Sequence, residues 1–261
     1  MSALSPESPI WRKINGVKSV LVVPDSPAPE IPAPTPEIPH VVVIPLMESH
    51  TRNRPKTLPS LAPDERSLDA FGDKRQFQAY VADNALTDLC PEHFTTPAVR
   101  FPCVLKRTDL NAGNGIAVAA SAEHLQSLLE QPPWRGHPAI LQAMVEGDGE
   151  IVTHCVCKRG RILWHTSFAY TLPPGELIRT SNNVQSIRPV RTASKTLRQL
   201  QRFLTPLRYN GPCNFDYKLT PKGTVMMMEI NPRLGGSLMR PENVAYLQAA
   251  LSCIVRNALR P

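Results

Sequence analysis

The chain has 261 residues, 42% of them hydrophobic and 20% charged, as is typical of a globular protein with room for one large domain or two small ones. Its longest apolar runs, Val20–Val23 and Val41–Ile44, exclude a membrane-spanning helix, and the first ten residues are not a signal peptide, so we expect a cytoplasmic protein. The net charge is +7, with ten basic residues but only Glu176 acidic in the range 151–210, which favours an anionic partner unless these charges are only a solvated surface.

The first 66 residues are rich in proline and hold 13 of the 28 prolines in the chain. The stretch 24–39 can form neither a helix nor a central strand, and we expect it to run as extended polyproline II structure. It joins two short predicted strands, Ser19–Val23 and His40–Ile44. Two strands without a helix between them form a thin subdomain at most.

Beyond residue 66 the sequence predicts alternating strands and helices. In chain order we expect a helix at 64–82, a strand at 101–106, a loop of small residues at 111–115, a strand at 116–119, a helix after Ser121 with Leu125, Leu128 and Leu129 facing inward, and a strand at 139–145. There follow a hairpin of strands 151–157 and 161–170, an amphipathic helix at 195–207, a hairpin of strands 214–219 and 224–231, and a helix from Pro241 with Val244 facing inward. Hairpins separated by helices favour an α+β fold over a doubly wound parallel sheet.

The second predicted hairpin carries two carboxylates that are expected to face each other. If its tip lies at Gly223, Asp216 pairs with Glu229, and Asn214 pairs with Asn231 on the same face. Opposed carboxylates with Cβ atoms about 4.5–5.5 Å apart repel each other and need a cation. Two carboxylates and an amide oxygen suit Mg²⁺. The alternatives are a solvent-facing strand pair with incidental charges, or a different register.

The opposite face of this hairpin is apolar and is predicted to meet the core through Phe215, Tyr217, Met228 and Ile230. Just beyond it, Arg233 is placed to reach the carboxylate face, where a guanidinium would bind a phosphate or a carboxylate. The following pair, Gly235 and Gly236, lets the backbone approach a ligand closely.

A lysine ends one of the predicted strands. Lys106 follows an apolar strand and precedes the loop Asn111–Gly115, and a strand-end lysine with backbone N–H groups of such a loop is one way to hold phosphates. The loop has neither the P-loop order nor a GxGxxG motif. The alternative is a surface lysine in a strand, turn and strand.

Together these segments resemble the ATP-grasp superfamily, and in particular its carboxylate–amine ligases. The matching motifs stand in the family's order: Gly72-Asp73-Lys74, the strand Phe101–Lys106, the glycine-rich flap Asn111–Gly115, the strand and hinge Leu141–Gly147, Asn214-Phe215-Asp216, and Met228–Arg233. The resemblance implies an ATP-grasp fold over residues 67–261, in which two α+β subdomains, about 67–140 and 141–261, hold ATP between antiparallel sheets. Residues 1–66 would be a reduced, proline-rich form of the α/β domain that begins family members.

The resemblance also implies roles for individual residues. Phosphate binding would fall to Lys74 and Lys106, and to the flap with Asn111, Gly113 and Gly115. The adenine would be surrounded by Gln142, Met144 and Val145, and the ribose hydroxyls would be bound by Glu150. One or two Mg²⁺ (or Mn²⁺) ions would be held by Asp216, Glu229 and Asn231. Arg233 and Lys106 would be catalytic, because they stabilise charge on the transferred phosphoryl group.

The chemistry that the resemblance implies is ATP-dependent amide or peptide bond formation. ATP would phosphorylate a small acidic carboxylate, and an amine would attack the acyl phosphate. The basic stretch 175–191, expected to be a loop, would bind the acid through Arg179, Arg188 or Arg191. A homodimer is expected only by analogy with the family.

Two other functions remain open. The short N-terminal segment is compatible with an ATP-binding pseudoenzyme, or with a subunit of such a ligase that needs a partner. The basic charge is compatible with nucleic-acid binding, but the chain has no recognition motif and no interleaved aromatic and basic residues, so we expect no nucleic-acid partner, and none in a membrane.

Overall fold

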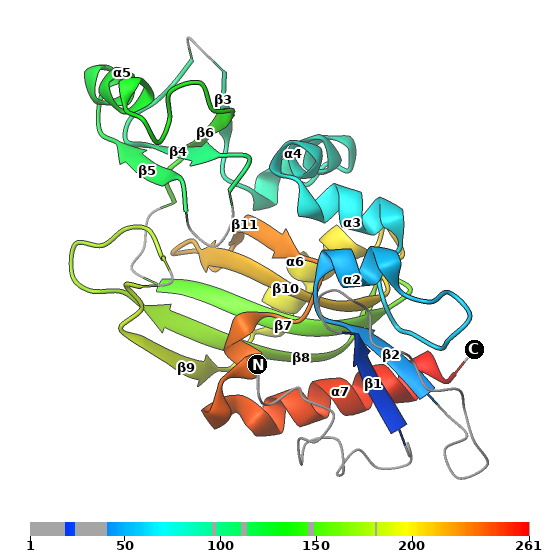
Figure 1. Cartoon of the computed structure of the whole chain (residues 1–261). Coiled ribbons are helices and arrows are strands. Elements are labelled where there is room, and N and C mark those ends of the chain that lie inside the picture. Colours follow the sequence, from blue (N-terminus) through cyan, green and yellow to red (C-terminus); the bar gives the residue numbers. More distant parts are fainter. Residues whose placement is uncertain are drawn as a thin grey trace.

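Two antiparallel sheets form the body of the protein (Figure 1). The computed structural model describes residues 19–23, 41–95, 98–110, 114–145, 149–180 and 182–260. The predicted polyproline stretch, most of the flap and part of the hinge lie outside these residues. Within the described ranges, no helix is both long enough and apolar enough to span a bilayer.

The smaller sheet has four strands in the order β3 (His93–Phe94), β6 (Ala139–Ala143), β4 (Cys103–Arg107) and β5 (Ile116–Ala119). Helix α5 (Ala122–Glu130) covers it and begins as predicted, because the Ser121 side chain accepts a hydrogen bond from the His124 backbone N–H. Leu125 and Leu128 pack onto the sheet, but Leu129 is exposed, contrary to the prediction. The helix is short and touches the sheet along a narrow stripe only.

The larger sheet has five strands in the order β11 (Val225–Asn231), β10 (Gly211–Leu219), β7 (Gly149–Lys158), β8 (Arg161–Thr171) and β9 (Ser186–Val190). Both predicted hairpins are present. Strand β9 was expected to be loop, because Arg188 and Pro189 interrupt its apolar pattern. It is an edge strand, where a proline is tolerated.

Helices cover both faces of the larger sheet, and a hydrophobic cluster fills each side (Figure 1). One face is covered by α3 (Glu65–Gly72), α4 (Lys74–Asp83) and α6 (Ser194–Leu204). The predicted helix 64–82 is divided in two, because the Asp73 carboxylate caps α4 by accepting from the backbone N–H groups of Arg75 and Gln76. The other face is covered by α7 (Val244–Ala258), which follows a short 3₁₀ turn η4 (Pro241–Asn243), and Val244 is exposed rather than inward.

The N-terminal residues are part of this architecture. Strand β1 (Ser19–Val23) pairs in parallel with β2 (Val41–Pro45), and helix α2 (Glu48–Asn53) follows. Val42 and Ile44 of β2 are fully buried in the same cluster as α7. The remaining short helices are η2 (Thr87–Leu89) and η3 (Gly236–Met239).

The carboxylate hairpin has the predicted register, with one difference. Asp216 pairs with Glu229 and Asn214 pairs with Asn231, as expected. A β-bulge then shifts the register, so that Tyr217 pairs with Met227. The prediction that Met228 faces the core is therefore wrong, because the bulge leaves Met228 as the extra residue of β11.

Candidate active site

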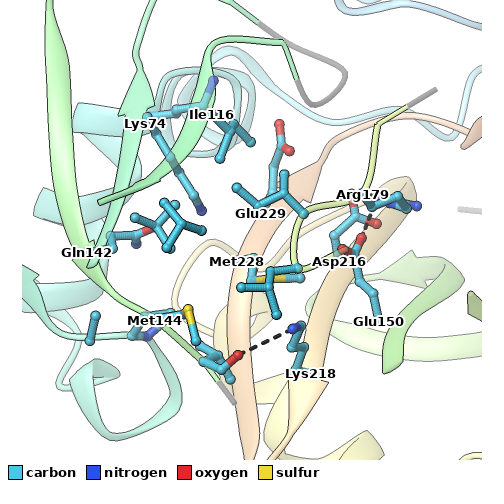
Figure 2. A pocket seen from close by; sticks show the side chains of 18 residues that line it. Lys74, Ile116, Gln142, Met144, Glu150, Arg179, Asp216, Lys218, Met228 and Glu229 are labelled. Atoms are coloured by element: carbon cyan, nitrogen blue, oxygen red, sulfur yellow. Dashed lines mark hydrogen bonds and ion pairs between the residues drawn. The ribbon is translucent and has the colours of Figure 1, made fainter. Parts of the chain in front are cut away.

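A cleft of about 110 Å³ lies between the two sheets (Figure 2). One wall comes from β4, β5 and β6 of the smaller sheet, and the other comes from β7, β10 and β11 of the larger sheet. We call this cavity the first cleft. Nine of the predicted site residues line it, namely Lys74, Lys106, Gln142, Met144, Val145, Glu150, Arg179, Asp216 and Glu229.

Arg179 bridges two carboxylates of the first cleft. Its guanidinium lies 2.6 Å from Glu150 and 3.1 Å from Asp216 (Figure 2). It also stacks 4.4 Å from the centre of the Tyr170 ring. All these groups are largely removed from solvent, so the ion pairs are strong and an unpaired charge here would be costly. Arg179 thus supplies the positive charge that the opposed carboxylates of Asp216 and Glu229 require.

Burial determines the protonation behaviour of this group. It raises the pKa of Asp216 to about 7, because Glu150 and Glu229 add to the effect and Arg179 only partly opposes it. Burial also raises the pKa of Glu150, again against the influence of Arg179. Asp216 Oδ1 is buried and has no hydrogen-bond partner within the described chain. An orphaned carboxylate oxygen of this kind fits a cation ligand.

Two lysines stand at the other end of the first cleft. Lys74, the first residue of α4, donates from Nζ to the carbonyl of Leu110 at 2.5 Å, directly before the flap. Lys106, on β4, is buried, and burial lowers its pKa although Glu229 and Glu150 oppose the shift. Both lysines line the first cleft, and Lys106 is close enough to Glu229 and Glu150 for their charges to act on its pKa.

A second cleft, of about 400 Å³, adjoins the first. The two cavities share three lining residues, Arg179, Asp216 and Glu229. The second cleft also contains Asn231 and Arg233 of the predicted site, together with Arg240. The opposed carboxylates therefore form a wall common to both cavities.

Arg233 is held by a residue from the N-terminal segment. Its Nε donates to Glu48 Oε1 at 3.0 Å, and Nη2 donates to Asn231 Oδ1 at 3.2 Å. Asn214 binds the Arg233 carbonyl through its Nδ2 at 3.1 Å. No sequence motif singles out Glu48, since it is 185 positions from its partner.

A buried histidine lies in the wall of the second cleft. His154 Nε2 is 2.6 Å from Ser237 Oγ, and burial together with Arg179 lowers the His154 pKa to about 3. Gly235 lies against the ring, because a Cβ there would be 2.4 Å from His154 Cε1. Only glycine fits at this position without displacing the imidazole.

A partly buried histidine lies next to the first cleft, and the sequence analysis did not identify it either. His93 of β3 contacts the side-chain amides of Gln78 and Gln142, the latter with an Nε2–Nε2 distance of 2.8 Å. Burial and the charge of Lys106 lower the His93 pKa to about 4. The residues around His93 form no motif that would predict its contacts with Gln78 and Gln142.

The remaining predicted residues lie elsewhere. Arg188 and Arg191 are exposed on and after edge strand β9, and neither lines either cleft. Gly115 has a φ of +64° in the turn before β5 and accepts a hydrogen bond at its carbonyl from the Arg107 N–H. Asn111 and Gly113 lie outside the described residues. Of the three arginines expected to bind an acid, only Arg179 reaches the clefts.

Comparisons with known proteins identify the architecture. No family model matches the chain, and no curated protein matches it in sequence. Among solved structures, L-amino acid ligase from Bacillus licheniformis superposes with a TM-score of 0.59 at 16% identity, covering 82% of this chain and 56% of that one. D-alanine–D-alanine ligase from Bacillus anthracis, complexed with ATP, superposes with a TM-score of 0.59 at 12% identity. The match covers 84% of this chain and 79% of that one. Carboxyaminoimidazole ribonucleotide synthase from Aspergillus clavatus, complexed with ATP, superposes with a TM-score of 0.57 at 16% identity. The match covers 75% of this chain and 54% of that one.

These likenesses concern the fold. The chain spans little more than half the length of two of these proteins, 56% and 54%. This chain has two antiparallel sheets with a cleft between them, which is the arrangement that the sequence motifs predicted. The chain therefore has the ATP-grasp fold.

Proposed function

We propose that this protein is an ATP- and Mg²⁺-dependent ligase that activates a carboxylate as an acyl phosphate and joins it to an amine. One observation carries the proposal. The first cleft, with two lysines and the apolar side chains Met144 and Val145, meets the second cleft at Asp216 and Glu229. A nucleotide in the first cleft would therefore direct its terminal phosphate towards a ligand in the second.

The donor set fits Mg²⁺. Asp216 and Glu229 are paired across the hairpin, and the buried Asp216 Oδ1 lacks a hydrogen-bond partner among the described residues. Nowhere in the part of the chain that the structure describes do three or more His, Cys, Asp or Glu side chains form a group that could hold a metal ion by itself. The other ligands would be Asn231, water and phosphate oxygens, as is usual for Mg²⁺. When bound, the cation would neutralise phosphate charge during transfer.

Each side chain then has a defined task. Lys74 and Lys106 would bind phosphate oxygens, and Arg233, held by Glu48, would stabilise charge on the transferred group. A carboxylate oxygen of the acid would attack the γ-phosphorus, and ADP would leave. The amine would then attack the acyl carbon, and phosphate would leave with the electron pair of the C–O bond.

Arg179 would be displaced from Asp216 when the cation binds, because two positive charges would then share one carboxylate, the guanidinium at Oδ2 and the cation at Oδ1. Released from Asp216, it would lie between the two clefts, where it could contact the acid or the phosphate. In that position Arg179 would bind the substrate, as the sequence analysis expects of it.

The test is release of ADP and phosphate from Mg-ATP in the presence of pools of amino acids, other small acids and amines. We expect turnover that depends on an acid, and a loss of at least about 100-fold in Glu229→Gln, because the cation loses a charged ligand. The matched control is Glu130→Gln, an exposed residue of α5, which should retain full turnover. If ATP binds but no acid triggers turnover, the ligase proposal is wrong, and an ATP-binding pseudoenzyme or partner-dependent subunit takes its place.

A further inference from the structure

Arg240 lines the second cleft but has no task in the proposed reaction. Its side chain is 47% exposed, whereas the side chain of Asp216, in the wall common to both cavities, is 11% exposed. Asp216 also lines the first cleft, and Arg240 does not. Arg240 therefore lies at the rim of the second cleft, away from the wall where phosphoryl transfer is proposed.

The backbone of Arg240 is held between two short 3₁₀ turns. Turn η3 ends directly before it, and η4 begins directly after it with Pro241, whose ring fixes the backbone angle φ. The Asn243 backbone N–H donates to the Arg240 carbonyl at 3.0 Å. The Asn243 side chain is buried and donates to the Ser237 carbonyl at 2.8 Å. The base of the Arg240 side chain is therefore fixed, while the exposed guanidinium can adjust to a ligand.

The charges of the second cleft favour an anionic group at this rim. In the part of the chain that the structure describes, the charged side chains lining the cleft, apart from the two carboxylates expected to bind the cation, are the arginines Arg179, Arg233 and Arg240. Arg179 and Arg233 already have tasks near the transferred phosphoryl group. Arg240 is thus the arginine that is left for a second anionic group of the ligand.

The partner of Arg240 in the structure is one that a ligand can replace. Arg240 Nη1 donates to Glu242 Oε1 at 3.1 Å, and the Glu242 side chain is 59% exposed and does not line the cleft. An exposed ion pair of this kind contributes little to stability. A ligand carboxylate can accept two parallel hydrogen bonds from a guanidinium, which is a stronger arrangement than the single bond to Glu242.

The same cleft offers apolar surface to a hydrocarbon chain. Val152, Val184 and Ile187 line it. Burial of methylene groups against such side chains is favourable. A cavity of about 400 Å³ has room for a short chain with a charged group at each end.

We propose that the acid bound in the second cleft is a dicarboxylic acid, of which one carboxylate is phosphorylated at the wall common to both cavities and the other is bound by Arg240 at the rim. The inference rests on the proposed ligase function and adds a residue that determines specificity. A monocarboxylic acid would leave Arg240 with Glu242 alone, and its affinity would not benefit from this guanidinium.

The first measurement is equilibrium binding by calorimetry, in the presence of Mg²⁺ and a non-hydrolysable ATP analogue. The probes are pairs of acids of equal chain length: succinate and butyrate, glutarate and pentanoate, adipate and hexanoate. We expect at least one dicarboxylate to bind about tenfold more tightly than its monocarboxylate counterpart, because hydrogen bonds between charged groups are strong. If no pair shows such a preference, the inference is wrong.

A variant of Arg240 distinguishes recognition from structural damage. Arg240→Met keeps an unbranched apolar stem but removes the charge, so it should weaken the preferred dicarboxylate about tenfold and change the monocarboxylate by less than about twofold. Arg161→Met, at the exposed first residue of β8, is the matched control and should keep the preference. Equal weakening of both acids in Arg240→Met, or a preference that survives the substitution, would overturn the role of Arg240.

Glu242 provides a test of opposite sign. Glu242→Gln removes the carboxylate that competes for Arg240, so the preferred dicarboxylate should bind about two- to threefold more tightly, with no change for its counterpart. Weaker binding of the dicarboxylate would contradict the exchange of Glu242 for a ligand carboxylate.

Turnover separates this inference from the proposed function. A dicarboxylate that binds through Arg240 but triggers no release of ADP with any amine overturns the ligase proposal and leaves the binding site standing. Equal turnover with monocarboxylates and dicarboxylates overturns the role of Arg240 and leaves the ligase proposal standing.

Discussion

At the scale of single residues, the site is a balance between buried charges of opposite sign. Arg179 joins Glu150 and Asp216, which lie on neighbouring strands of the larger sheet. The sequence identified all three as site residues, yet it assigned them to three different ligands. It could not show that they contact each other, because Arg179 belongs to the irregular chain between β8 and β9.

Removing the guanidinium should destabilise the protein. Arg179→Ala leaves two buried carboxylates unpaired, and we expect the free energy of unfolding to fall by about 3 kcal/mol at pH 8. The loss should be smaller at pH 6, where Asp216 can protonate, since its pKa is already about 7. Denaturant unfolding at the two pH values measures this, with exposed Arg188→Ala as control. An equal loss at both pH values would contradict the argument.

His154 should make stability depend on pH. Its pKa of about 3 in the folded protein is below the ordinary value of 6.5, so the unfolded chain binds more protons between these values. Its contribution is therefore complete above pH 6.5 and is lost as the pH falls towards 3, with a slope of up to about 1.4 kcal/mol per pH unit.

The comparison that isolates this effect is with His154→Asn. Asp216 acts in the opposite direction in part of the same range, because its folded pKa is raised. The difference in unfolding free energy between wild type and variant removes that contribution. It should shrink from pH 7 to pH 4, and a constant difference would show that His154 is not buried in its neutral form.

At the scale of elements, contacts could be predicted where the two partners are close in the sequence, and not where they are far apart. The register of β10 and β11 could be predicted, because a short turn fixes which residues are opposed. The bulge could not, because three successive methionines, Met226–Met228, give no sign of which one is extra. His93 and Gln142 are 49 positions apart, and no local pattern links them.

The turn after β11 offers a test with a matched control in the next residue. Gly235→Ala places a methyl group 2.4 Å from His154 Cε1 and 3.0 Å from Asn214 Cγ, so the ring or the turn has to move. We expect a loss of about 1–3 kcal/mol in stability. Gly236→Ala meets no atom within 4 Å and should change stability by less than about 0.5 kcal/mol. Thermal or denaturant unfolding of both variants measures the contrast, and equal effects would exclude the close approach as the cause.

At the scale of the whole molecule, the described residues from β2 to α2 pack against distant parts of the chain. The N-terminal sequence predicted little beyond two short strands, because proline-rich chain carries no periodic pattern. In the structure, β2 contributes to the cluster beneath α7, and Glu48 reaches Arg233. Both contacts join parts of the chain that are distant in sequence, which is why composition alone indicated only a thin subdomain.

This integration can be measured by truncating one side chain. Ile44 is 1% exposed, and Ile44→Ala should cost about 2–4 kcal/mol, because it leaves a cavity next to α7. Met47, three residues later and 40% exposed, is the control, and Met47→Ala should cost less than about 0.5 kcal/mol. Denaturant titration gives both values. A negligible loss for Ile44→Ala would show that β2 folds separately from the main sheet.

The wall shared by the two clefts has a thermodynamic consequence. Because Arg179, Asp216 and Glu229 line both cavities, an occupant of either one would contact groups that the other occupant also meets. Linkage then requires reciprocity: the factor by which a nucleotide changes the affinity for a second ligand equals the factor by which that ligand changes the affinity for the nucleotide. The three side chains thus make the two halves of the site a single cooperative unit.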